Sequence, residues 1–403
     1  MGNPLPHPGD FAPRPTAADF ARWEASDALA RPERLAALRR RMLAAELDGL
    51  LLTAHSDARY FSGMRFGPNE EPTAGSSGWL LVVADALAIT VDSRYAVQAR
   101  DEAPGAEALD YGSDAGATVG AWFAGHGCRR IGADPQLLRH ATWERLAASI
   151  GGAELVASRG LSASIRSIKE PAEVERIAAA CAVADRALAG LLPEIATGIS
   201  EAHLAWRLER AMREGGAEAL AFDVAALAGG NAALPHGNPG ERELRRGEVI
   251  LFDFGAQVGG YRSDMTRTLF VGSASDGDLQ RYDAVRRGQA AAIDLLRGAL
   301  GERRALPSGR ACDEAARAAM AGEPGVYDHG LGHGIGLQTH EAPSLSRNAP
   351  QEPLAGPTVF SVEPGIYLAD RIGIRIEDLV HVDPAAGRLE QLTRFPSEPL
   401  IVG

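Results

Sequence analysis

The chain has 403 residues, which at roughly 150 residues per domain predicts two or three domains. Its 45% apolar and 23% charged residues are typical of a globular protein. The formal net charge of -12 disfavours nucleic acid as a partner, because that binding depends on neutralising phosphates. The longest apolar stretch, 79–91, is interrupted by Asp85 and falls short of the roughly 18 apolar residues that a membrane span needs.

The first fifteen residues form a leader with five prolines. It contains no apolar segment of the kind found in secretion signals, and Pro6 stands where a myristoylation signal needs Ser or Thr. The three cysteines, Cys128, Cys181 and Cys312, are widely separated and lack CxxC spacing, which fits a reducing compartment. We therefore expect a cytoplasmic protein that does not enter the membrane.

The first part of the chain has the pattern of an α/β domain. Thr16 and Asp19 resemble a capping box that opens a short helix. A second helix is predicted over 31–47, because its apolar residues share one helical face. Further strands and helices follow: we expect strands at 49–53, 79–84 and 88–91, and helices at 94–102 and 143–149.

The pattern changes between residues 160 and 170, where we place a domain boundary that gives domains 1–165 and 166–403. Pro171 suits the first turn of a long helix, and Ser200 is the expected cap of a helix that ends near Glu214. Most of the remaining sequence predicts β-hairpins, with two further helices at 282–300 and 313–321. The second domain is therefore expected to be α+β.

Two aspartates lie on strand-like runs joined by Gly259 and Gly260. If these glycines form a two-residue hairpin turn, Asp253 lies opposite Thr266 and Asp264 becomes its diagonal neighbour on the same face. Two carboxylates on one half-buried face repel each other unless one is protonated or a cation lies between them. The pair is therefore a candidate for metal binding or acid/base chemistry, and the alternative is that one or both are ordinary surface acids.

A second acidic pair follows near the C-terminus, where Glu363 closes one apolar run and Glu377 interrupts another. An isolated ionised carboxylate is costly to bury, so Glu377 needs a cation. Arg375, two residues earlier on the same strand face, is an alternative that would make this a structural ion pair.

A glycine-rich segment of twelve residues between the two acidic pairs contains three histidines, His329, His333 and His340. Imidazole is a common metal ligand, and glycines let the backbone approach a ligand closely. Competing motifs are absent, because the glycines do not match GxGxxG, no GxSxG occurs, and Ser344 stands where HExxH needs its second histidine.

In order and spacing, five residues resemble the metal ligands of the prolidase, aminopeptidase P and methionine aminopeptidase family. They are Asp253, Asp264, His333, Glu363 and Glu377. The motifs span about residues 222–380, and the preceding α/β segment is similar to the creatinase/prolidase-type N-terminal domain. The resemblance therefore implies an α/β N-terminal domain followed by an α+β pita-bread catalytic domain.

The resemblance also implies two divalent metal ions. Asp264 and Glu377 would bridge them, Asp253 would chelate one, and His333 with Glu363 would hold the other. Four carboxylates and one imidazole suit Mn²⁺ best, with Co²⁺, Zn²⁺ and Fe²⁺ as alternatives. Such ions polarise a scissile carbonyl and lower the pKa of a bound water.

The function implied is hydrolysis of the bond before proline in Xaa-Pro dipeptides or short Xaa-Pro peptides, by a homodimer whose partner helps to close the cleft. Glu363 would shuttle the proton, while His236, His329 and His340 would bind substrate and donate hydrogen bonds in catalysis. Arg375 is a further candidate for substrate binding.

The sequence departs from the family at two positions. Ser344 replaces an arginine that clamps the free carboxylate of a dipeptide in some prolidases, and Phe222 replaces a tyrosine of some relatives. Three other arginines are candidates for the missing clamp: Arg65, Arg94 and Arg347.

Four alternatives remain open. Methionine aminopeptidase is disfavoured by the additional N-terminal domain, and a creatinase-like amidinohydrolase by the complete ligand set. A metal-dependent exopeptidase without strict proline preference and a catalytically silent binding module of the same fold are the other two.

Overall fold

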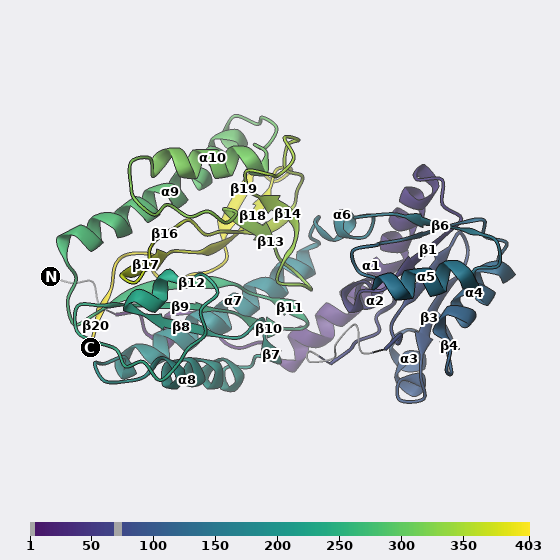
Figure 1. The fold of residues 1–403 in the computed structure, drawn as a ribbon, viewed down its shortest axis with the longest axis horizontal. Coiled ribbons are helices and arrows are strands. Elements are labelled where there is room, and N and C mark those ends of the chain that lie inside the picture. The colour runs from purple at the N-terminus through teal and green to yellow at the C-terminus, as the bar shows by residue number, and fades with distance from the viewer. Residues whose placement is uncertain (1–4, 68–74) are drawn as a thin grey trace. The chain divides into compact units, whose positions relative to one another are not determined.

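The computed structural model describes residues 5–67 and 75–403, which form two compact units (Figure 1). One unit spans Glu24–Arg166, and the other joins the described residues up to Trp23 to Ser167–Gly403. The leader was expected in the first domain, but its described part packs with the second unit. The reason is apolar packing, since the Phe11 ring stacks on Phe395 and Trp23 is 3% exposed in that unit's core. Residues 1–4 of the leader lie outside the described residues.

The capping box of Thr16 is confirmed at the start of helix α1 (Ala17–Ala44). The Asp19 N–H donates to Thr16 Oγ1 at 3.3 Å, and the Thr16 N–H donates to Asp19 Oδ2 at 2.9 Å. The predicted division into two helices is wrong, because α1 continues through Pro32. Leu38 and Met42 beyond the proline are 0% and 2% exposed. Burial of about 1.5–3 kcal/mol per such side chain offsets the roughly 3 kcal/mol cost of an internal proline.

The unit Glu24–Arg166 contains a six-stranded mixed sheet in the order β4-β3-β2-β1-β5-β6. Its strands are β1 (Gly49–Leu52), β2 (Leu80–Val83), β3 (Leu87–Val91), β4 (Glu107–Asp110), β5 (Arg130–Ala133) and β6 (Glu154–Ala157). Its shorter helices are α2 (His55–Ser62), α3 (Ala96–Glu102), α4 (Ala115–Gly125), α5 (His140–Ser149) and α6 (Ala163–Arg166). The α/β prediction is confirmed. Strands β4, β5 and β6 were not predicted. Exposed residues such as Glu107 and Glu154 leave β4 and β6 without a continuous apolar run, and β5 begins with Arg130 and is interrupted by Gly132.

The second unit is α+β. Its helices are η1 (Pro8–Asp10), α7 (Pro171–Leu191), η2 (Leu192–Glu194), α8 (Glu201–Glu214), η3 (Gly229–Ala233), α9 (Asp276–Gly301) and α10 (Gly309–Ala319). Its first strands are β7 (Ala219–Leu220), β8 (Ala225–Ala228), β9 (Val249–Phe254), β10 (Ala256–Val258), β11 (Tyr261–Arg262), β12 (Met265–Val271) and β13 (Gly332–Gly334). They are followed by β14 (Glu341–Leu345), β15 (Thr358–Val362), β16 (Gly365–Leu368), β17 (Ile372–Arg375), β18 (Asp378–Asp383), β19 (Arg388–Gln391) and β20 (Ile401–Val402). Over the described ranges, no helix combines the length and the apolar character needed to cross a bilayer.

Helices α7 and α8 cover one side of the sheet β20-β12-β9-β8, and α9 and α10 lie on the other side (Figure 1). Alternate residues of β9 therefore enter two different cores. Ile250 and Phe252 pack with α7 and α8, whereas Val249 and Leu251 pack with α9 and α10. Because side chains alternate along a strand, Asp253 continues the second row and points to the same side as Val249 and Leu251.

The predicted hairpin is confirmed. Gly259 and Gly260 have φ angles of +55° and +80°, which glycine adopts without steric cost, and Asp253 lies opposite Thr266. Asp264 falls in the interruption between β11 and β12. This interruption frees the Asp264 backbone from a regular ladder, so its side chain can turn into the buried space beside Asp253.

Strand β13 lies between β14 and β15, and its glycines are required by this close packing. A Cβ atom at Gly332 would lie 2.0 Å from the Ser361 carbonyl oxygen, and one at Gly334 would lie 2.1 Å from that of Ala342. These glycines therefore allow three backbones to approach one another around His333. The sequence interpretation, that they let the backbone approach a ligand, stays a prediction.

We expect Gly332→Ala to destabilise the protein by about 3 kcal/mol, at the upper end for overpacking, and to displace His333. The matched control is Gly298→Ala on α9, where a Cβ would meet no atom within 4 Å and where alanine should stabilise the helix by about 1 kcal/mol. Urea unfolding of both variants measures the difference. Equal stability of Gly332→Ala and the unmodified protein would contradict the packing argument.

Candidate metal centre

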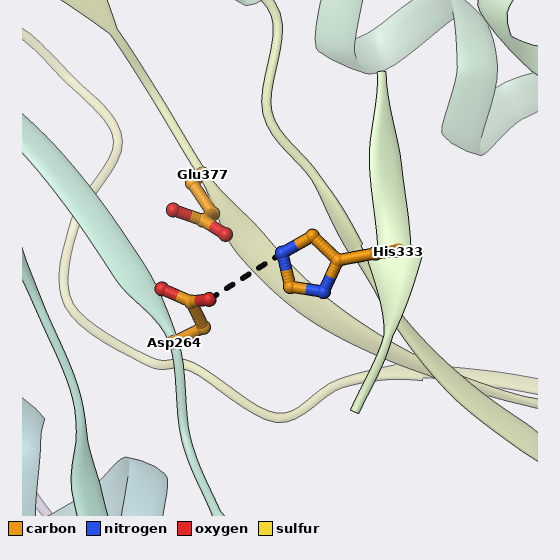
Figure 2. A group of neighbouring side chains, drawn as sticks. All are labelled: Asp264, His333 and Glu377. Carbon is orange, nitrogen blue, oxygen red and sulfur yellow. Dashed lines mark ion pairs between the residues drawn. The ribbon is translucent and has the colours of Figure 1, made fainter. Parts of the chain in front are cut away.

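A carboxylate, an imidazole and a second carboxylate meet in the second unit. One ligand atom each from Asp264, His333 and Glu377 lies within 4.8 Å of the others (Figure 2). The three residues come from the β11–β12 interruption, from β13 and from the short break between β17 and β18. His333 Nε2 lies 3.5 Å from Asp264 Oδ2 and 3.4 Å from Glu363 Oε1. The structure therefore brings four of the five predicted ligands together at His333.

The tautomer of His333 follows from its contacts. Its Nδ1 lies 3.1 Å from the Gly334 carbonyl oxygen, which can only accept, so Nδ1 carries the proton. Burial lowers the pKa of His333, which favours the neutral ring. The Nε2 lone pair then faces oxygens of Asp264 and Glu363, which repel it when their carboxyl groups are ionised. A divalent cation would turn these repulsive contacts into coordination.

Asp253, the fifth predicted ligand, forms a buried ion pair with Arg375. Arg375 Nη2 donates to Asp253 Oδ2 at 2.5 Å, and Arg375 is 4% exposed. Its Nη1 donates to the Tyr367 hydroxyl at 2.9 Å and its Nε to Thr266 Oγ1 at 2.9 Å. Each donor nitrogen of Arg375 thus has a partner inside the protein. The carboxylate that Arg375 pairs with is therefore Asp253 rather than Glu377, the partner suggested by the sequence, and its role in substrate binding stays a prediction.

Hydrogen bonds hold one carboxylate oxygen of Glu377, one of Glu363 and one of Asp253. Thr266 Oγ1 donates to Glu377 Oε2 at 2.7 Å, and Ser361 Oγ donates to Glu363 Oε1 at 3.1 Å. Within the described part of the chain, Glu377 Oε1 and Asp253 Oδ1 are buried and have no hydrogen-bond partner. A buried anionic oxygen without a donor is costly, so these two atoms and His333 Nε2 fit a site for divalent cations.

The electrostatics agree with this fit. Burial, followed by the charges of Glu377, Asp253 and Glu363, raises the pKa of Asp264 well above its usual range. Burial and the neighbouring carboxylates do the same to the pKa of Glu377. Burial also raises the pKa of Glu363, although Arg375 opposes it. The single guanidinium cannot neutralise four carboxylates, and a divalent cation would favour their ionised forms.

The other predicted histidines differ in what they can donate. His329 Nδ1 lies 2.7 Å from the Gly330 carbonyl oxygen and its Nε2 lies 3.0 Å from the Tyr367 hydroxyl. Burial lowers the pKa of His329, so the neutral ring has its one N–H on Nδ1 and accepts from Tyr367. His340 is exposed and its ring centroid is 4.1 Å from that of His333, while His236 is also exposed. His340 and His236 are therefore the histidines with accessible ring nitrogens.

The three arginines suggested as a replacement clamp are each paired with acids. Arg347 Nη2 lies 2.5 Å from Asp328 Oδ1. In the other unit, Arg65 pairs with Glu24 and Glu102, and Arg94 pairs with Asp92. Ser344 itself is exposed, and its hydroxyl lies 3.3 Å from that of Ser346. Phe222 is half-buried, and a phenyl ring at this position offers no hydrogen bond.

Three residues of the site were missed in the sequence, one of them Ser361, whose hydroxyl accepts from the His333 N–H and donates to Glu363. Tyr367 joins His329 to Arg375 through its hydroxyl, and Thr266 joins Arg375 to Glu377. The sequence could have identified Thr266 as a site residue, because the predicted hairpin register already placed it opposite Asp253. Tyr367 carried none, since its role depends on the pairing of β16 with β17, which brings it near Arg375.

Comparison with known proteins agrees with this geometry. Residues 175–384 match metallopeptidase family M24, and residues 34–168 match the creatinase/prolidase N-terminal domain. The uncharacterized peptidase YqhT of Bacillus subtilis is 31% identical over 360 residues, which are 88% of this chain and 96% of that protein. The Xaa-Pro dipeptidase of Pyrococcus furiosus is 34% identical over 233 residues, which are 57% of this chain and 65% of that protein.

Solved structures give the same result. An Xaa-Pro dipeptidase from Bacillus anthracis superposes with a TM-score of 0.82 at 31% identity and covers 92% of this chain and 100% of that one. The X-Pro aminopeptidase of Thermotoga maritima has a TM-score of 0.75 at 30% identity, covering 89% and 98%. The chain therefore belongs to metallopeptidase family M24, with a creatinase/prolidase N-terminal domain before a pita-bread catalytic domain.

Proposed function

We propose that this metallopeptidase hydrolyses the peptide bond before proline and releases the N-terminal residue of Xaa-Pro dipeptides or short Xaa-Pro peptides. The observation that carries the metal-dependent chemistry is the position of His333 Nε2, which lies 3.4 Å from a Glu363 oxygen and 3.5 Å from an Asp264 oxygen. The names of the relatives, Xaa-Pro dipeptidase and X-Pro aminopeptidase, support the preference for proline.

The proposed cofactor is a pair of divalent ions, with Mn²⁺ preferred and Co²⁺, Zn²⁺ or Fe²⁺ as alternatives. Asp253, Asp264, His333, Glu363 and Glu377 would hold them. Divalent ions supply Lewis acidity to a substrate carbonyl and make water a better nucleophile. The oxygen-rich donor set supports this choice, because carboxylates suit Mn²⁺ and its neighbours better than thiophilic metals.

The protein's own groups would handle the proton and the substrate. Glu363 is the proposed proton shuttle: Ser361 orients its carboxyl group, and burial raises its pKa, so that it can accept a proton and return it to the leaving nitrogen. His340 and His236 are the proposed donors to the substrate, because their rings are exposed beside the buried centre. His329 would act through the Tyr367 hydroxyl that it accepts from.

Proline at the second position gives a tertiary amide without an N–H and with a fixed φ angle. A peptidase that binds the scissile N–H therefore handles such a bond poorly. The proposed site instead acts on the carbonyl and protonates the leaving nitrogen. Because Ser344 offers no positive charge to a free carboxylate, tripeptides and longer peptides should compete well with dipeptides.

Two other functions differ in testable ways. A metal-dependent exopeptidase without proline preference would cleave Leu-Ala and Leu-Pro alike, and a silent binding module would cleave neither.

We also propose a homodimer in which the partner helps to close the cleft. Light scattering that shows a fully active 42 kDa monomer would contradict the dimer.

We predict that Mn²⁺ binds with release of protons and binds more tightly as the pH rises. The pKa values of Asp264 and Glu377 are raised, so below these pKa values a proton must leave before the cation binds. Without metal, the same raised values make the folded state less stable as the pH rises through them. Mn²⁺ should therefore increase Tm more at pH 8 than at pH 6.

Calorimetric titration in two buffers of different ionisation enthalpy counts the released protons. Asp264→Asn, which removes one of the two groups with a raised pKa, should release fewer protons on Mn²⁺ binding and should lose activity. Full activity of thoroughly metal-stripped protein, or Mn²⁺ binding that does not vary with pH, would contradict the proposed centre.

We predict faster hydrolysis of Leu-Pro and Leu-Pro-Pro than of Leu-Ala and Met-Ala-Ser, with Mn²⁺ present and the first residue released. The reason is the tertiary amide, whose leaving nitrogen needs a proton but offers no hydrogen bond. Initial rates at equal substrate concentration make the comparison. Faster cleavage of either proline-free peptide than of both proline peptides would leave only a general metal-dependent exopeptidase.

We predict that His340→Ala keeps its metal but loses about 10²- to 10³-fold in rate, the usual effect of removing one positioned donor. His203→Ala is the control, because His203 is also an exposed histidine of the second unit and lies outside the centre on α8. Metal content and kcat are measured on both. Metal loss in His340→Ala would make His340 a ligand instead.

A further inference from the structure

Gln289 is a buried amide on α9, the helix that packs behind the metal centre. It is 7% exposed, and its neighbours on the buried face of the helix, Val285, Ala292 and Ile293, are apolar. A buried amide in such a setting is costly unless it is hydrogen-bonded. The side chain therefore requires acceptors, and it finds them in the strands that carry two of the proposed ligands.

The Gln289 Nε2 group donates to acceptors that flank both glutamates. It lies 3.1 Å from the Val362 carbonyl oxygen, 3.4 Å from the Ile376 carbonyl oxygen and 2.9 Å from Asp378 Oδ2. Val362 and Ile376 directly precede Glu363 and Glu377, and Asp378 directly follows Glu377. The Gln289 amide thus hydrogen-bonds to the peptide groups that directly precede Glu363 and Glu377.

Neither glutamate lies within a regular strand ladder. The pairing of β15 with β18 ends at Val362 opposite Asp378, and the pairing of β16 with β17 ends at Gly365 opposite Arg375. Between these ends, the backbone contact across the break is a long one, 3.5 Å from the Ile376 nitrogen to the Pro364 carbonyl oxygen. The amide of Gln289 lies at this break and supplies hydrogen bonds that the ladder does not.

A buried ion pair anchors this amide. Asp378 Oδ1 accepts from Arg267 Nη2 at 2.6 Å and from Thr393 Oγ1 at 2.6 Å. Arg267 Nη1 also donates to the Glu377 carbonyl oxygen at 2.6 Å. Both partners of the ion pair are at most 1% exposed. Gln289 therefore hydrogen-bonds to Asp378, which the ion pair fixes next to Glu377, and also to Val362, the residue before Glu363.

We propose that Gln289 is a positioning residue that sets the separation of Glu363 and Glu377, and thereby the affinity and geometry of the divalent cation site. The proposal rests on the metal centre of the proposed function but not on the proline preference. The hydrogen bonds of the Gln289 side-chain nitrogen go to other acceptors than the carboxyl groups of Glu363 and Glu377. It acts through the backbone on either side of the break.

The test replaces Gln289 by methionine, which has a similar length and no N–H donor. The control is Ile293→Ala on the same helix face, which removes apolar packing and leaves the break untouched. Binding of Mn²⁺ alone is measured by calorimetry, and Co²⁺ alone by its visible spectrum. For the more weakly bound of the two Mn²⁺ ions, we expect Gln289→Met to have an affinity at least tenfold lower than that of the unmodified protein. We also expect an altered Co²⁺ spectrum and a lower kcat at nearly unchanged KM. Ile293→Ala should be less stable but keep both affinities within twofold.

Wild-type affinities and an unaltered Co²⁺ spectrum in Gln289→Met would overturn the proposal, whatever its stability. If that variant does not fold, Gln289→Asn, which withdraws the amide by one methylene, is compared with Ile293→Ala in the same way. Unmodified protein that binds ions but ignores Xaa-Pro peptides would refute the proline preference and leave the role of Gln289 standing. Unmodified protein that binds no ion would overturn both.

Discussion

An excess of buried negative charge is the constraint on which the centre of this protein depends. Asp253, Asp264, Glu363 and Glu377 share a space that contains one guanidinium, that of Arg375. Arg375 already neutralises Asp253 at 2.5 Å. Three carboxylates then remain beside the unprotonated nitrogen of an imidazole, and such an arrangement is unfavourable unless protons or cations enter it. The metallopeptidase family to which the chain belongs uses cations for this purpose.

Interrupted strands bring these charges together. Asp264 lies between β11 and β12, and Glu363 and Glu377 lie at the break between two ladders. A continuous strand would place alternate side chains on the two sides of the sheet and could not aim them all at one point. The cost of each interruption is the loss of ladder hydrogen bonds. Side chains replace them, because Arg267 and Gln289 donate to buried carbonyl groups at this break.

The sequence predicted those features that short-range rules determine. The Gly259-Gly260 turn fixed the register of its hairpin, so Asp253 was placed opposite Thr266 correctly. The partner of Arg375 was predicted less well, because strand periodicity gives the face of a side chain but not the strand it meets. The packing role of the glycines around His333 was not predicted for the same reason: it comes from neighbouring backbones that lie adjacent only after folding. Helix α1 shows the opposite case, in which tertiary packing outweighs a local helix breaker, Pro32.

The buried and the exposed residues of the site have different roles in the proposed function. His333 and the carboxylates are held by strands, by Ser361 and Thr266, and by the Arg375 pair, so their positions are determined by the core. His340 and His236 lie exposed beside them, and Ser344 supplies no charge for a free carboxylate. In the proposed function, cation binding and the attack on the carbonyl would depend on the first group, which resembles the family closely. The length of the preferred peptide would depend on the second group, in which Ser344 departs from the prolidase pattern. A change of substrate can therefore arise at the exposed rim without any change in the buried ligands.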